Sequence, residues 1–421
     1  VTATLCKKFF LFNLTIILVF IFLSSCAVLL YGKLNGFHYE MEWVEIVRHS
    51  YTDEYVRYVS FSDDGRRIAV VTSSLNQSRR AVHVYEIKTD SERLIPLGSP
   101  VHHNSFCDIS LSGDGNRLAI APRVSLAGKK IVRVFEVLEY SHNNSAWEFV
   151  GDGINAVIEN EREEVNDEKY KYKVSLSYNG HRIVIVEPRS HQGDGLARVF
   201  ENPPNTSEWI QLGQTLHGAN RERLGTSVSI SDGGGLFVVG SPDFDGFSGK
   251  VQTNQLGLSI SWVKKGRFIN GTKINDAFGF MTDISGDGST LAVASRWDRF
   301  ESDGHVSVYK VDKGTWRQVG DKIDVMGRLT MRTRISCSSK GSRILIGVPG
   351  LPYNSAKVHV FEYDEQNGWK QLGYINAHGD NSKLCQGAFS FSGEGNRVAM
   401  GCTISAGSFQ ILELKKVPEM Q

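Results

Sequence analysis

The residues that could carry out chemistry are scattered along this sequence and form no catalytic motif. There is no Gly-x-Ser-x-Gly elbow, no His-Glu-x-x-His pair, no glycine-rich phosphate loop and no Cys-x-x-Cys pair. His102 and His103 are adjacent, and neighbouring side chains on an extended chain point to opposite sides, so the pair does not favour a shared metal. The sequence therefore predicts no catalytic residue by motif, no metal site and no cofactor.

Arginine and aromatic residues gather in the segments that separate apolar runs. This composition is typical of binding hot spots, because both kinds of side chain bury a large area and make directed contacts. We expect a protein or an acidic glycan as the ligand, and a solvated rim with no ligand is the alternative. The candidate ligand-binding residues are Arg123, Arg189, Arg296, Trp297, Arg299 and Tyr353.

Two kinds of covalent modification are open to the chain. Cys385 and Cys402 flank the turn at Gly393 to Gly395, so a hairpin folded there brings them nearly opposite each other, as a disulfide requires. Two buried thiols are the alternative, and this is the class expected for Cys107 and Cys337. The candidate glycosylation sites are Asn76, Asn143, Asn205 and Asn270.

The N-terminal 37 residues differ from the rest of the chain. Lys7 and Lys8 precede an uncharged run from Phe9 to Tyr31, which as a helix would reach ~35 Å and could cross a ~30 Å hydrocarbon core. The lysines favour a cytoplasmic N-terminus, so we expect a single-pass membrane protein whose body lies outside the cytoplasm. A cleaved signal peptide, giving a secreted protein, and a lipoprotein signal ending at Cys26 are the alternatives.

The charge and composition of the chain limit its function classes. Its 47 basic and 46 acidic side chains leave a formal net charge of +1, so there is no overall field to attract a polyanion, and nucleic-acid binding is not expected. The 42 glycines against 10 prolines indicate many tight turns. An all-β architecture fits this balance.

A turn of the type Ser-x-Asp-Gly or a close variant recurs along the chain. Its glycines are 50, 65, 53, 55, 53 and 54 residues apart, which matches one four-stranded propeller blade per repeat. Asp-Gly and Asn-Gly fit a two-residue hairpin, because these residues tolerate positive φ. The seven copies begin at Ser62, Ser112, Ser177, Ser231, Ser285, Ser338 and Ser392.

Each copy of the turn joins two short apolar strands, for example Tyr58 to Phe61 and Arg67 to Val71. A third strand follows, and then a fourth that usually opens with Trp, as at Trp147 and Trp209. Six of the seven Trp residues lie in such fourth strands, where we expect them to pack between blades.

The two ends of the repeat array complement each other. The last repeat has no fourth strand, and Trp43 to Val47 carry the fourth-strand pattern with no strand before them. We therefore predict a seven-bladed β-propeller over residues 38–417, closed by the N-terminal strand, with a tail at 418–421.

The repeats resemble the FG-GAP repeats of integrin-α-like propellers. The resemblance rests on Phe278-Gly279 followed by Ser285-Gly286-Asp287-Gly288, and on Leu224-Gly225 followed by Val239-Gly240-Ser241-Pro242. The turns are equally similar to the WD40-like repeats of TolB-type propellers. All seven turns are too short for the expanded acidic loop with which FG-GAP repeats bind Ca²⁺.

The resemblance implies a non-catalytic recognition module at the cell surface, which binds a protein or a glycan through its loops. An enzyme with its active site in the central channel is one alternative, and a structural surface-coat protein is another. A convergent group of two or more buried carboxylates or histidines at the channel would favour the enzyme.

Overall fold

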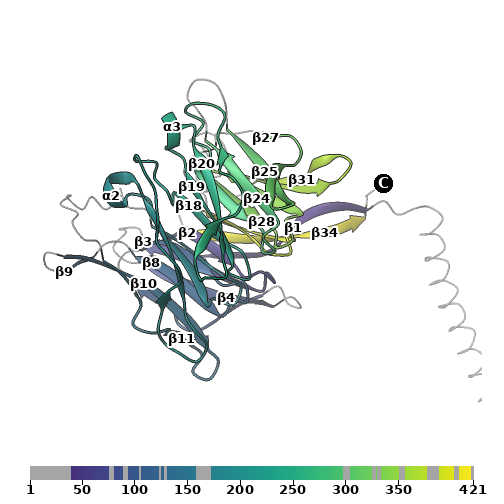
Figure 1. Ribbon diagram of the computed structural model, residues 1–421. Helices are drawn as coiled ribbons and strands as arrows, with labels where there is room; N and C mark the ends of the chain where they lie inside the picture. Colours follow the sequence, from purple (N-terminus) through teal and green to yellow (C-terminus); the bar gives the residue numbers. More distant parts are fainter. Residues whose placement is uncertain are drawn as a thin grey trace, which may run out of the picture. The chain divides into compact units, whose positions relative to one another are not determined.

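A computed structural model describes residues 39–74, 80–88, 93–103, 106–122, 125–127, 130–157, 172–296, 304–324, 329, 333–349, 356–376, 388–402 and 407–418. The chain divides into two compact units. The larger unit runs from Trp43 to Glu413 and is a seven-bladed β-propeller (Figure 1). Of the smaller unit, the structure describes only residues 39–42 and 414–418, which are strand ends.

The first four blades are antiparallel sheets with four main strands in chain order. Blade 1 contains β2 (Glu54–Phe61), β3 (Arg67–Ser74), β4 (Arg80–Lys88), β5 (Arg93–Pro96) and β6 (Val101–His103). Blade 2 contains β7 (Phe106–Leu111), β8 (Arg117–Pro122), β9 (Ser125–Ala127), β10 (Lys130–Ser141), β11 (Ala146–Phe149) and β12 (Ile154–Val157). Blade 3 contains β13 (Lys173–Leu176), β14 (Arg182–Glu187), β15 (Leu196–Glu201), β16 (Ile210–Gln211) and β17 (Leu216–His217). Blade 4 contains β18 (Ser227–Ile230), β19 (Leu236–Ser241), β20 (Lys250–Leu256), β21 (Trp262–Lys264) and β22 (Ile269–Asn270). The additional short strands β6, β9, β12, β17 and β22 each pair with the third main strand of their blade.

The last three blades complete the ring, and the seventh combines strands from both ends of the body. Blade 5 contains β23 (Met281–Ile284), β24 (Thr290–Ser295), β25 (His305–Asp312), β26 (Thr315–Gln318) and β27 (Ile323–Asp324). Blade 6 contains β28 (Arg334–Cys337), β29 (Arg343–Val348), β30 (Lys357–Asp364) and β31 (Gly368–Asn376). Blade 7 contains β32 (Ala388–Phe391), β33 (Arg397–Cys402), β34 (Ser408–Pro418) and β1 (Tyr39–Ser50). Two single-turn helices, α2 (Ser190–Gly193) and α3 (Phe244–Phe247), follow the second strands of blades 3 and 4.

The recurring turn is a hydrogen-bonded unit, as blade 1 illustrates. The Ser62 hydroxyl donates to Asp64 Oδ1 at 2.7 Å and accepts the backbone N–H of Arg67 at 2.9 Å. Gly65 has φ of 64°, a conformation that glycine adopts without strain. Serine, aspartate and glycine are therefore needed to build the turn.

The seven turns are joined to one another in a closed ring of backbone hydrogen bonds. In each bond a turn N–H of one blade donates to a turn carbonyl of the next, so every blade is fixed to both neighbours. The donor and acceptor residues are Asp63 to Gly113, Asp114 to Tyr178, Tyr178 to Asp232, Asp232 to Gly286, Asp287 to Ser339, Ser339 to Gly393 and Glu394 to Asp63.

Arginine side chains reinforce this ring in five of the seven blades. Each arginine stands at the start of a second strand and donates from Nη1 to the carbonyl of the glycine in the next turn. The pairs are Arg67 to Gly115, Arg117 to Gly180, Arg182 to Gly234, Arg343 to Gly395 and Arg397 to Gly65. The last pair links blade 7 to blade 1.

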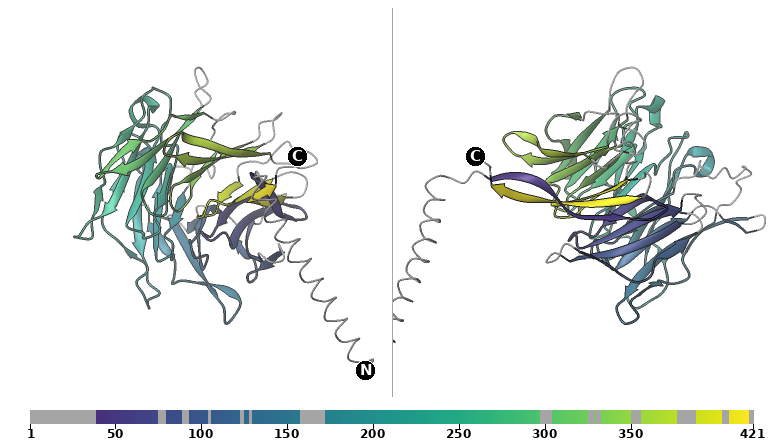
Figure 2. Two further views of the ribbon diagram at one scale, coloured as in Figure 1. Left: turned by 90° about the vertical axis from the view of Figure 1, so that its right-hand side faces the viewer. Right: turned by 180° about the vertical axis from the view of Figure 1, so that it is seen from behind.

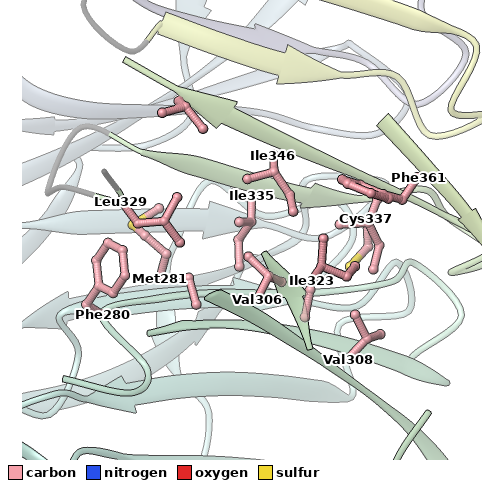
Figure 3. Close-up of a cluster of buried hydrophobic side chains, with 14 residues drawn as sticks. Phe280, Met281, Val306, Val308, Ile323, Leu329, Ile335, Cys337, Ile346 and Phe361 are labelled. Carbon is pink, nitrogen blue, oxygen red and sulfur yellow. The ribbon is translucent and has the colours of Figure 1, made fainter. Parts of the chain in front are cut away.

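The hydrophobic core is divided among the blade interfaces. Each of the seven buried clusters takes its residues from two adjacent blades. In the cluster between blades 5 and 6, Val306 and Val308 face Ile335, Ile346 and their neighbours (Figure 3). Each sheet thus buries both faces against its neighbours, which requires the ring to close.

Tryptophans of the fourth strands bridge the blades, as predicted. Trp147 Nε1 donates to the Leu97 carbonyl of the preceding blade at 2.8 Å, and Trp369 Nε1 donates to the Val319 carbonyl at 3.0 Å. Trp43 makes the equivalent bond, at 3.1 Å, to the Leu372 carbonyl of blade 6. β1 lies beside β34 in both views of Figure 2. The predicted closure of the last blade by the N-terminal strand is confirmed.

The predicted membrane or signal segment, Phe9 to Tyr31, lies outside the described residues. The two helices that the structure describes are single turns of four residues each, so neither could serve as a membrane span.

Replacing Trp43 with Ala should weaken the closing seam. Truncation removes the apolar contact with blade 6 and the bond to Leu372, and we expect a loss of about 2–3 kcal/mol in the free energy of unfolding. Trp43→Phe keeps most of the apolar contact and should lose about 1 kcal/mol. Urea unfolding followed by fluorescence measures both changes.

The matched control is Trp369→Ala, which removes the same contact at an interface within the chain. Similar losses at the two positions are expected. If the change at Trp369 is costly and the change at Trp43 is neutral, the N-terminal strand does not hold the ring closed.

Candidate active site

The first strand of each blade faces the axis of the ring. One layer of first-strand side chains, which we call the serine layer, holds adjacent blades together. In this layer a serine hydroxyl accepts the backbone N–H of the first strand in the next blade. Ser60 accepts from Leu111 at 3.1 Å, and Ser110 accepts from Leu176 at 3.1 Å. Ser175, Ser229 and Ser390 do the same for Ile230, Ile284 and Phe61.

Asp283 takes the place of this serine in blade 5. Its Oδ2 accepts the backbone N–H of Cys337 at 2.6 Å. Burial raises the pKa of Asp283 to about 6, although hydrogen bonds from Ser229 and from the Cys337 backbone act in the opposite direction. Blade 5 therefore contributes a carboxyl group that titrates near neutral pH at the axis.

The next layer, toward the face of the interblade loops, brings together charged residues from distant parts of the chain. Here Tyr58, Asp108, Lys173, Met281 and Arg334 form what we call the axial cluster. Lys173 Nζ lies 3.6 Å from Met281 Sδ, and Arg334 Cζ lies 5.9 Å from the centre of the Tyr58 ring. These contacts join blade 3 to blade 5 and blade 6 to blade 1.

Asp108 is the carboxylate of the axial cluster. Burial raises its pKa, while Lys173 and Arg334 lower it, and its Oδ2 accepts the Val174 backbone N–H at 3.2 Å. Asp108, Lys173, Arg334 and Tyr58 are all only partly buried. The cluster thus places one partly buried carboxylate near two cations.

Two further carboxyl groups meet at the hairpin end of the axis. Asp63 of blade 1 and Asp232 of blade 4 are hydrogen-bonded to each other. Burial and the negative charge of Asp63 raise the pKa of Asp232 to about 7, and burial also raises that of Asp63, whose Oδ2 accepts the Ser339 hydroxyl at 3.2 Å. The pair therefore shares a proton at neutral pH, because two adjacent carboxylates resist simultaneous ionisation.

The axial cluster has the groups that hydrolysis of an ester requires. A carboxylate at a partly exposed site can take a proton from water, and its raised pKa makes it a stronger base than an ordinary aspartate. Lys173 and Arg334 can stabilise a negative oxygen, and this effect is strongest where protein atoms exclude most of the water. The arrangement fits attack of water on a carbonyl carbon.

The candidate ligand-binding residues are only partly within the described chain. Arg123, Trp297, Arg299 and Tyr353 lie outside the described residues. Arg189 and Arg296 are exposed, and they follow β14 and β24 on the face of the interblade loops. Both act on the carboxyl group of Asp243, so the structure brings these two predicted residues together.

The predicted covalent modifications are partly described. Cys337 is a buried free thiol, as expected. Cys385 lies outside the described residues, and of Cys402 only the strand position is described, with Ala388 opposite Gly401 in this hairpin. The disulfide therefore stays a prediction. Asn143, Asn205 and Asn270 are exposed, and Asn76 lies outside the described residues.

The axial residues were not predicted as a site. They come from five blades, and five different residue types occupy the equivalent position, so no motif marks them. The repeat itself does provide a signal, because each of the five residues lies four positions before the serine of the recurring turn. Comparing that position across all seven repeats would have assembled the cluster.

Comparisons with known proteins identify the fold. No family model and no curated protein matches the sequence. A provisionally assigned 6-phosphogluconolactonase from Bacteroides uniformis has a TM-score of 0.52 and 13% identity over 76% of this chain and 88% of its own. A periplasmic gluconolactonase from Pseudomonas aeruginosa has a TM-score of 0.51 and 18% identity over 76% of this chain and 84% of its own. At these identities the likeness shows a shared propeller fold.

The expectation of a non-catalytic recognition module is wrong. Both of these similar structures are described as lactonases, and neither is described as a receptor. The first strands at the axis also carry two carboxyl groups whose pKa values are raised by burial, Asp108 and Asp283. The physical reason for the error is that this group is assembled by the ring and is invisible in any one repeat.

Replacing Asp232 with Asn should change how stability depends on pH. The folded protein keeps the shared proton up to about pH 7, whereas an ordinary Asp loses it near 3.8. The stabilisation of the folded state by this proton is complete below pH 3.8, the ordinary pKa of Asp, and is lost as the pH rises through about 7. Asp232→Asn should therefore be more stable than the parent above pH 7, by on the order of 1 kcal/mol after screening by solvent.

Denaturant unfolding of both proteins between pH 4 and pH 8 measures this difference. Asp312→Asn, at a half-exposed carboxylate on β25, is the control and should follow the parent throughout. A constant difference between Asp232→Asn and the parent over this range would contradict the shared proton.

Proposed function

We propose that this protein is a hydrolase whose active site is the axial cluster, and that it opens a cyclic ester of a sugar acid. The observation that carries the proposal is the convergence of Asp108, Lys173 and Arg334 at one partly exposed position on the axis. Buried charge is costly, and a group with a shifted pKa between two cations is characteristic of catalytic sites.

The reaction follows from the groups in the cluster. Asp108 takes a proton from a water molecule while the oxygen of that water forms a bond to the lactone carbonyl carbon. Lys173 and Arg334 stabilise the negative oxygen of the tetrahedral intermediate. The bond from this carbon to the ring oxygen then breaks, and the proton held by Asp108 passes to that oxygen to give the open hydroxy acid.

Tyr58 and Met281 act as positioning residues for the two cations. The Arg334 guanidinium lies over the Tyr58 ring, and Lys173 Nζ rests against Met281 Sδ. A cation held against an aromatic face keeps its orientation at little conformational cost. Both contacts hold the charges in place before a substrate arrives, as electrostatic catalysis requires.

The choice of substrate class is supported by the similar structures, which are described as a provisional 6-phosphogluconolactonase and a gluconolactonase. Both share the propeller fold with this chain at 13% and 18% identity. The geometry of the axial cluster supports hydrolysis in general, and the similar structures support a sugar lactone as the first substrate to test.

Two further assignments accompany this proposal. We infer that the chain belongs with FG-GAP-like propellers, because the Leu224-Gly225 and Phe278-Gly279 segments make equivalent parallel bridges to Gly195 and Gly249. We also infer that the apolar run from Phe9 to Tyr31 tethers the propeller to a membrane, on the charge and length of that run alone.

Replacing Asp108 with Asn should abolish most lactonase activity. The amide cannot accept the proton of the attacking water, so kcat/KM for glucono-δ-lactone should fall about 10²- to 10⁴-fold. Lys173→Met removes one positive charge at similar volume and should lower kcat about 10²-fold or more. Acid release in weakly buffered indicator solution, corrected for spontaneous hydrolysis, measures both.

Asp312→Asn is again the control and should keep the activity of the parent, while thermal unfolding shows whether each variant is folded. Full activity in folded Asp108→Asn would exclude Asp108 as the base. A parent protein that accelerates hydrolysis of neither sugar lactones nor simple aryl esters would overturn the proposed function.

A further inference from the structure

Three arginines from three different loops surround one carboxylate on the face of the interblade loops. Arg189 follows β14 of blade 3, Arg223 precedes β18 of blade 4, and Arg296 follows β24 of blade 5. The carboxylate is Asp243, which follows β19 of blade 4. The positive groups therefore come from adjacent blades and converge on the loop between them.

Asp243 neutralises only part of this charge. Arg223 donates from Nε and is ion-paired through Nη2 to Asp243 Oδ2. The side chains of Arg189 and Arg296 are exposed to solvent. They lie close enough that both lower the pKa of Asp243, against the larger raising effect of its burial. The three arginines therefore outnumber the single carboxylate on which they converge.

The nearby carboxylates of the same loops are engaged elsewhere. Glu222 forms an ion pair with Lys250 at 2.7 Å, and both side chains are buried. Asp276 Oδ2 accepts the Ser295 hydroxyl at 3.1 Å. Glu222 is therefore neutralised by Lys250, whereas Asp276 keeps its negative charge, because a serine hydroxyl does not neutralise a carboxylate.

The loops that carry the arginines are fixed to one another by backbone hydrogen bonds. The Arg223 N–H donates to the Gly193 carbonyl at 3.0 Å, and the Arg296 N–H donates to the Asp276 carbonyl at 2.8 Å. Arg223 also has φ of 52°, a strained conformation for a side chain of this kind. The backbone thus holds Arg223 in place at a cost in strain, which is a common feature of binding sites.

We infer that Arg189, Arg223 and Arg296 form a binding site for a compact dianion, such as a phosphoryl or sulfate group. The positive charge of the three arginines favours an anion of this kind. Planar guanidinium groups offer paired donors in the geometry that tetrahedral oxyanions accept. The inference does not depend on the chemistry at the axial cluster, and it assigns a role to Arg189 and Arg296 beyond that of a solvated rim.

Calorimetric titration of the whole protein with inorganic phosphate and with glucose 6-phosphate tests the inference. We expect saturable binding, and we expect the double variant Arg189→Gln/Arg296→Gln to lose at least tenfold in affinity for both. Arg317→Gln, at an exposed arginine paired with Asp312 on blade 5, is the matched control and should bind as the parent does.

The variant Asp243→Asn should change phosphate affinity in the direction opposite to the double variant. Removing the internal carboxylate frees Arg223 and raises the excess charge, so phosphate should bind several-fold more tightly. This gain cannot come from a folding defect, since loss of structure would only weaken binding. No saturable binding by the parent, unchanged affinity in the folded double variant, or weaker binding by folded Asp243→Asn would each overturn the inference.

The two ligands separate the possible sources of the dianion. Tighter binding of glucose 6-phosphate than of inorganic phosphate, with the difference lost in the double variant, supports a site for a phosphorylated sugar. Equal affinity for the two, also lost in the double variant, supports a site for the free anion. Glucose alone should neither bind nor compete, and competition by glucose would contradict a site made by charge.

Discussion

Closure of the ring is the constraint on which the rest of this structure depends. Each sheet has two apolar faces, and each face is buried only if the next blade is in place. The turn-to-turn hydrogen bonds require a fixed number of blades. The N–H of Glu394 in the last turn bonds to the carbonyl of Asp63 in the first turn only when seven blades are in place. Opening one seam would expose two apolar faces and an unpaired strand edge at once, which explains why Trp43 repeats a contact made throughout the array.

The scaffold also explains why charge can collect at the axis. In the serine layer each hydroxyl holds the next blade in register, so those positions have little freedom to vary. In the adjacent layer, among the described first strands, such a bond is made by Asp108 alone, to the Val174 N–H, and the layer contains Tyr58, Asp108, Lys173 and Arg334 in place of one residue type. Positions that the ring does not need are available for chemistry, and the ring brings them within contact of one another.

The sequence predicts the fold well because short, repeated sequence features determine it. The serine, aspartate and glycine of each turn and the Trp of each fourth strand are local features, and Trp43 shows the closing strand by the same rule. The site is different. Asp108 and Arg334 belong to blades 2 and 6 and come together only when the ring closes, so their proximity depends on a long-range geometry that no local pattern carries. Arg189 and Arg296 were identified by their residue type, whereas Arg223 and Asp243 were not, because the loops that carry them give no periodic signal.

The two ends of the axis differ in charge, and this difference gives the proposed reaction a direction. At the hairpin end Asp63 and Asp232 hold a shared proton among interlocked turns, and an anion there would meet carboxyl groups. Toward the loop face lie Lys173 and Arg334, and the loops themselves carry Arg189, Arg223 and Arg296. An acidic or phosphorylated substrate is therefore attracted from the loop face. Opening a lactone creates a carboxylate beside Asp108, and the repulsion between these like charges favours departure of the product toward the arginines, by the route through which the substrate entered.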